Sequence, residues 1–69
     1  MDINKAVDKA FEKSTFKELA NAPVSALQGV SEGDAELLYK AFKIKTVKQL
    51  ANLKYVKWAQ AIVTFADLE

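Results

Sequence analysis

The side chains that most often perform catalysis are missing from this 69-residue chain. It has no histidine and no cysteine, so the usual general base, the usual zinc ligands and any disulfide are absent. Without a base, nothing in the sequence activates a serine or threonine as a nucleophile. The hydroxyl residues stand instead where they cap helices: Ser14, Thr15, Ser31 and Thr46. We expect a non-enzymatic protein that needs no cofactor and has no small-molecule substrate.

The nearest approach to a metal site is a group of three carboxylates, Glu32, Asp34 and Glu36. Acids in the first turn of a helix are ordinary partners of the positive end of the helix dipole. We therefore interpret these residues as helix-start residues and expect no metal.

Lysines form the second group of chemical interest. The formal net charge is only +1, but the segment 37–66 contains lysines and no acid. Every basic residue is lysine, so the bidentate fork of arginine that reads guanine is missing. Contact with nucleic acid would thus be independent of base sequence. The candidate phosphate-contacting residues are Lys40, Lys43, Lys45, Lys48, Lys54 and Lys57.

The sequence contains no membrane signal. No apolar run approaches the roughly 20 residues that cross a bilayer, and the N-terminus lacks the charged-then-apolar pattern of a signal peptide. We expect a cytoplasmic protein with no membrane partner.

Helical spacing of apolar residues predicts the elements that would position these groups. A first helix is expected over 3–13, with Asp2 as its cap and an apolar side that includes Val7. Capping-box pairs then predict helix starts at Thr15 with Glu18, Ser31 with Asp34, and Thr46 with Gln49. Pro23 ends the second helix near 22 and opens a helical turn over 24–27.

The remaining boundaries complete an all-α single domain over 1–69. The third helix is expected from 32 to about 42, and Asn52 separates a short helix from a last one at about 54–68. We predict a compact bundle of about five short helices. Its buried stripes would include Phe16, Leu19, Ala20, Ala35, Leu37, Leu38, Ala41 and Phe42.

The last helix is apolar around well over half of its circumference. Tyr55, Trp58, Ile62 and Phe65 lie on one side, and Val56, Ala59, Val63 and Ala66 lie on the adjacent side. Two arrangements are open. Both sides are core because the helix runs through the bundle, or Tyr55, Trp58 and Phe65 form an exposed patch for a partner or a second subunit. Base stacking by Tyr55 and Trp58 beside Lys54 and Lys57 is a third, weaker interpretation.

Two stretches, 26–38 and 42–51, together resemble the helix-hairpin-helix family. That family typically shows Gly-apolar-Gly in the hairpin, and here the hairpin residues are Gly29, Val30, Ser31 and Gly33. The resemblance covers somewhat under half the chain and implies a helix-hairpin-helix (SAM-like) arrangement. The other positions that fit the family pattern are Leu27, Ala35, Leu38, Ile44, Thr46, Val47 and Leu50.

The charge of the hairpin indicates whether this chain is expected to bind phosphate as some members of the family do. In members that bind nucleic acid, the resemblance implies that hairpin amides at a helix N-terminus meet a phosphate. Here Ser31 replaces the second hairpin glycine, and Glu32 and Asp34 flank the phosphate position. Two carboxylates repel a phosphate and compete for the same amides.

Two hypotheses follow. The first is a binding module for protein–protein interaction or self-association, with a protein partner or a second copy of the chain. The alternative is weak, sequence-independent DNA or RNA binding through the hairpin and the lysine-rich segment 40–57.

Overall fold

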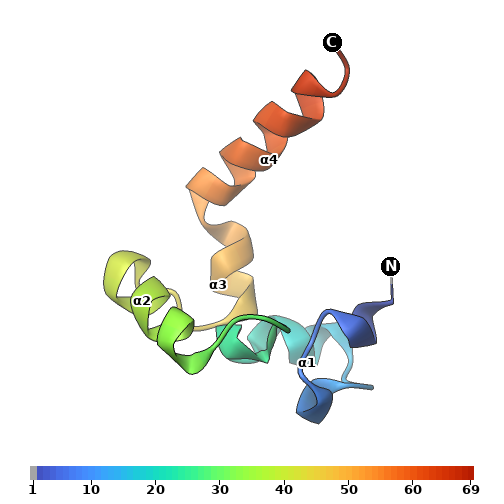
Figure 1. The fold of residues 1–69 in the computed structure, drawn as a ribbon, viewed down its shortest axis with the longest axis vertical. Coiled ribbons are helices and arrows are strands. Elements are labelled where there is room, and N and C mark those ends of the chain that lie inside the picture. Colours follow the sequence, from blue (N-terminus) through green and yellow to red (C-terminus); the bar gives the residue numbers. More distant parts are fainter. Residues whose placement is uncertain (1) are drawn as a thin grey trace.

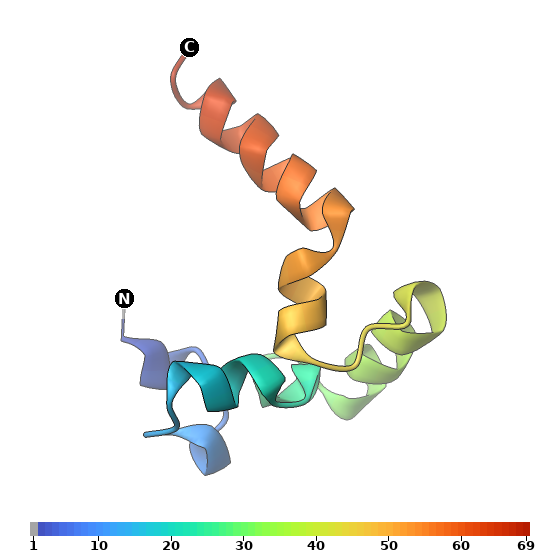
Figure 2. The same ribbon diagram turned by 180° about the vertical axis from the view of Figure 1, so that it is seen from behind.

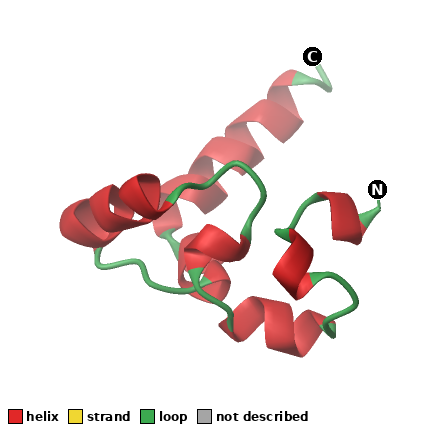
Figure 3. Cartoon of the chain, turned by 60° about the horizontal axis from the view of Figure 1, so that its bottom comes forward, coloured by secondary structure: helices red, strands yellow, loops and turns green. Residues whose placement is uncertain are grey.

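The computed structural model describes residues 2–69, and this part of the chain is helical with no β-strand. Figures 1 and 3 show short helices joined by loops. The prediction of an all-α fold is confirmed. The elements are the single 3₁₀ turns η1 (Ile3–Lys5), η2 (Lys9–Phe11) and η3 (Val24–Ala26) and the helices α1 (Phe16–Asn21), α2 (Glu32–Phe42), α3 (Val47–Asn52) and α4 (Lys54–Ala66).

Capping boxes fix the starts of α1, α2 and α3, as the sequence predicts. In each box the first side chain accepts a hydrogen bond from the third helical N–H, at 3.0–3.1 Å, and the third side chain accepts from the cap N–H. The Thr15 backbone N–H donates to the Glu18 carboxylate at 2.7 Å. That bond, together with one from the Thr15 side chain, lowers the pKa of Glu18 below its ordinary value of 4.5.

The helix predicted over 3–13 is wrong. Only η1 and η2 form there, although Asp2 does cap η1 by accepting from the Asn4 N–H at 3.0 Å. Between the turns, Asp8 N–H donates to the Ala26 carbonyl at 2.7 Å and Gln28 N–H donates to the Ala6 carbonyl at 2.9 Å. This antiparallel bridge of Val7 with Leu27 draws the Val7 side chain into the core, and it uses backbone groups that a helix would need.

The core is small and centres on η3. Backbone hydrogen bonds from Val24 N–H to the Lys45 carbonyl (2.9 Å) and from Val47 N–H to the Ala22 carbonyl (3.0 Å) hold η3 against the start of α3. The η3 turn also contacts α2, while α1 packs on α3. The buried apolar residues are Val7, Leu19, Ala22, Val24, Ala26 and Ile44.

Helix α4 leaves this body. Leu53 is the single residue between α3 and α4, and its extended backbone (φ −62°, ψ 122°) turns the chain sharply. Figures 1 and 2 both show α4 pointing away from the other helices. The Cα radius of gyration is 13.3 Å, whereas a compact domain of this length has about 11 Å. Residues 2–69 therefore form four α-helices, one of them projecting, in place of the predicted compact bundle of about five helices.

Some stripes that the sequence predicts to be buried are exposed. Phe16, Leu37 and Phe42 lie at the surface, and Leu38 is only half-buried. A helical pattern identifies the apolar side of an element, but burial also needs a second element to cover it. Because α4 projects from the body and residues 3–13 form only two short turns, too few residues remain to cover α2.

We predict that Val24→Ala lowers the free energy of unfolding by about 2 kcal/mol, because it removes methyl groups from the most deeply buried large side chain. That is a large part of the roughly 3–10 kcal/mol expected for a domain of this size. Urea unfolding of the dilute chain measures it. The matched control, Val63→Ala on exposed α4, should change the value by less than about 0.5 kcal/mol. Equal losses in the two variants would contradict this placement of the core.

Candidate functional site

Four large side chains form a row along α4. Tyr55, Trp58, Ile62 and Phe65 are spaced three, four and three residues apart, which places them on one side of a helix. We call these four residues the α4 ridge. Their exposed fractions are 52%, 56%, 68% and 68%, so more than half of each residue is open to solvent. A continuous exposed row of aromatic and aliphatic side chains is unusual for the surface of an isolated small domain.

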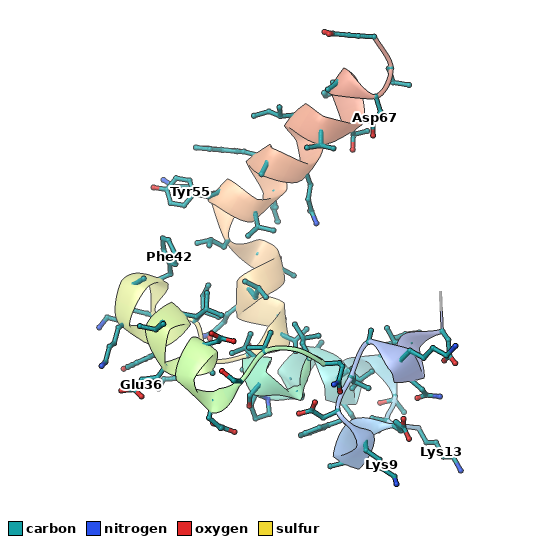
Figure 4. All side chains as sticks on the ribbon, in the orientation of Figure 1. Lys9, Lys13, Glu36, Phe42, Tyr55 and Asp67 are labelled. Carbon is teal, nitrogen blue, oxygen red and sulfur yellow. The ribbon has the colours of Figure 1, made fainter. Side chains whose placement is uncertain are left out.

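The base of the α4 ridge is joined to the end of α2. The Phe42 and Tyr55 rings lie side by side, with centroids 6.3 Å apart and planes inclined by 56° (Figure 4). Tyr55 then meets Trp58 edge to face at 5.7 Å. Aromatic pairs in such geometries add about 0.5–1.5 kcal/mol beyond their area burial. These contacts hold the first turns of α4, and beyond Val56 every α4 residue is exposed.

The adjacent side of α4 carries small residues. Ala59, Val63 and Ala66 follow one another next to the ridge, and a shallow hollow is lined by Ala59, Gln60, Val63 and Thr64. All of these are exposed. Tyr55, Trp58 and Phe65 therefore lie at the surface, and the last helix does not run through a core.

The charges of α4 oppose its own dipole. Lys54 and Lys57 stand in its first turns, with the Lys54 ammonium 5.3 Å from the Tyr55 ring centroid and 5.6 Å from that of Trp58. Asp67 is the C-cap and Glu69 follows it. Helices are stabilised by acids at the N-terminus and bases at the C-terminus, the reverse of this pattern. Leu53 also offers no side-chain cap.

The candidate hairpin residues form a turn that is surrounded by acids. Gly29 has a φ of 96°, in the left-handed region, and Ser31 caps α2 two residues later. A shallow hollow beside it is lined by Gly29, Val30, Ser31 and Glu32, together with Ser25 and Asp8. No sequence pattern indicates that Asp8 lies there, because only the bridge between Val7 and Leu27 brings it to the hairpin. The added carboxylate makes the site still less favourable for a phosphate.

The candidate lysines fall into two groups. At the end of α2 and the start of α3, Lys43 and Lys45 both lie over the Tyr39 ring, at 5.1 and 5.2 Å, and Lys48 lines one hollow together with Lys43. Lys54 and Lys57 form the second group on α4. Lys40 pairs with Glu36 at 3.0 Å, so its charge is partly neutralised.

Two members of the exposed surface were not included in the candidate patch. The sequence places Ile62 on the same side of the last helix as Tyr55, Trp58 and Phe65, and this spacing was the signal for including it. Phe42 extends the ridge onto α2, but no local pattern distinguishes this exposed position from a core one.

Residues 2–69 contain no group of three or more metal-ligating side chains. None of the helices described here has the length and apolar content to cross a bilayer.

The fold and the α4 ridge together define a small all-α domain with one uncovered apolar helix. No family model, curated protein or solved structure matches this chain. The exposed surface is therefore the guide to its function.

The two hairpin glycines should respond to alanine with opposite signs. Gly29→Ala should destabilise the fold by about 1 kcal/mol, because its φ of 96° strains any residue with a Cβ. Gly33→Ala should stabilise it by up to about 1 kcal/mol, because Gly33 lies in α2 and its added Cβ would meet only Ser31 Oγ at an ordinary 3.7 Å. Thermal unfolding of both variants measures the pair. Destabilisation by Gly33→Ala would contradict the assigned helix start.

Proposed function

We propose that this protein is a non-enzymatic, helix-hairpin-helix-like module for protein–protein interaction, and that the α4 ridge is its contact surface. The observation that carries the proposal is the exposure of Tyr55, Trp58, Ile62 and Phe65 in one row. Interfaces are enriched in aromatic side chains at their centres, and such residues supply most of the binding free energy. The partner that fits is an apolar protein surface, whether on another protein or on a second copy of the chain.

The total exposed area supports a surface that becomes covered. The chain exposes 5558 Å² for a mass of 7.6 kDa. A compact monomer of this mass exposes about 4,300 Å². The excess of about 1,300 Å² is larger than the roughly 800 Å² that each partner buries in a standard interface.

The helix-hairpin-helix arrangement belongs to the same proposal. Its support is the left-handed Gly29 followed by a capped α2, at the spacing of the family hairpin. The element before Gly29 is a single 3₁₀ turn, η3, rather than a longer helix. The acids Asp8, Glu32 and Asp34 around this hairpin favour a structural role for it over phosphate binding.

The proposal predicts that Ile62→Asp removes self-association seen for the wild-type chain by sedimentation velocity over a concentration series. A carboxylate in the middle of the ridge would have to be desolvated on binding, and the association constant should fall at least about tenfold. Thr64→Asp is the matched control. It adds the same charge two residues away on the polar side of α4 and should leave the association constant within about twofold.

Either of two results would contradict the proposal. One is a wild-type chain that sediments as a monomer at every concentration and whose Trp58 emits at short wavelength, because the chain would then bury its own ridge. The other is an association that Ile62→Asp and Thr64→Asp weaken equally, because binding would then not involve the α4 ridge.

The second candidate function is weak, sequence-independent binding of DNA or RNA. It is favoured by the exposed Tyr39 ring with the Lys43 and Lys45 ammoniums over it, since aromatic faces beside lysines can stack bases and neutralise phosphates. Binding of this kind weakens steeply with added salt. A low-salt titration with duplex and single-stranded DNA that detects no binding removes this candidate.

A further inference from the structure

We propose that the α4 ridge is covered by the α4 ridge of a second copy of this chain, with the two α4 helices antiparallel. This inference rests on the proposed function and specifies its partner and geometry. Three independent features of α4 lead to it: its low stability as a single helix, the placement of its charges, and the spacing of its ridge.

Alone, α4 lacks the features that stabilise a projecting helix. It has 13 residues, and isolated helices shorter than about 12–15 residues are marginal in water. More than half of its residues are aromatic or β-branched, which are weaker helix formers than alanine or leucine: Tyr55, Val56, Trp58, Ile62, Val63, Thr64 and Phe65. It has no side-chain N-cap, and only its first turns contact the body. Such a helix needs an apolar neighbour along its length.

The charges of α4 identify the neighbour's direction. Lys54 and Lys57 at one end and Asp67 and Glu69 at the other are unfavourable for the helix that carries them. In an antiparallel pair, the basic end of each α4 lies beside the acidic end of the other, and the two helix dipoles point in opposite directions. In a parallel pair, the two basic ends would lie together and so would the two acidic ends. The same residues therefore favour only the antiparallel pair.

The α4 ridge is also complementary to itself in this direction. With positions 55, 58, 62 and 65 as the seam, antiparallel pairing sets Tyr55 against Phe65 of the second copy and Trp58 against its Ile62. Each contact occurs twice through the two-fold axis, as in a closed dimer. The small residues Ala59 and Ala66 flank the seam on one side and let the helix axes approach. The Phe42 ring, next to Tyr55, lies where Phe65 of the second copy would arrive.

Because the chain contains no cysteine, single introduced cysteines give a clean test of direction. The test uses Lys54→Cys and Leu68→Cys, both at exposed positions near opposite ends of α4. In the antiparallel pair, position 54 of one copy and position 68 of the other come within about 3 Å along the axis, whereas position 54 of one copy stays about 18 Å from position 54 of the other. A disulfide requires Cα atoms within about 7 Å.

Mild oxidation of an equimolar mixture of the two variants should give predominantly the mixed disulfide dimer. Each variant oxidised alone should give little dimer. Predominant homodimers from the separate variants would establish a parallel pair and overturn this inference while leaving the proposed function in place. Association without any cross-link at these sites would also overturn it. A chain that never associates would overturn it as well. The proposed function itself fails only if the monomer buries its own ridge, or if Ile62→Asp and Thr64→Asp weaken association equally, so the two failures are distinguishable.

Discussion

The structure depends on the burial of η3 between segments that are distant in sequence. Val24 N–H bonds the Lys45 carbonyl on one side of this turn, and Ala26 accepts from Asp8 N–H on another. With both bonds made, Val24 and Ala26 are almost completely removed from water. These bonds gather the N-terminal turns, α1, α2 and α3 around one short segment. They satisfy the backbone groups of a turn too short to satisfy its own.

That arrangement has a consequence for the rest of the chain. A core centred on a three-residue turn has little surface, and the buried residues there are mostly valine and alanine. It cannot also accommodate the large side chains of α4. The bend at Leu53 directs α4 away from the core, and tyrosine, tryptophan, isoleucine and phenylalanine remain exposed in one row. The apolar residues that a compact monomer would bury are thus concentrated on a single projecting element, which is the physical basis of the proposed interaction surface.

Local signals predicted local structure well. The capping pairs at Thr15, Ser31 and Thr46 located three helix starts. The prediction was wrong where a contact between residues far apart in the sequence determines the local structure. The spacing around Val7 is helical, but pairing with Leu27 overrides it. Likewise, the spacing from Tyr55 to Phe65 showed an apolar row, but no local pattern shows whether another element covers that row. No local pattern shows that Asp8 lies beside the hairpin either.

The central claim is that a second molecule covers the α4 ridge, and Trp58, the only tryptophan, reports on it directly. The measurement is the emission maximum of Trp58 as the chain concentration rises from dilute to concentrated. We predict the long-wavelength emission of a water-exposed indole in dilute solution and a shift to shorter wavelength at high concentration. Emission that stays at long wavelength at every concentration would contradict the claim. So would short-wavelength emission in the most dilute sample, since the chain would then bury its own ridge.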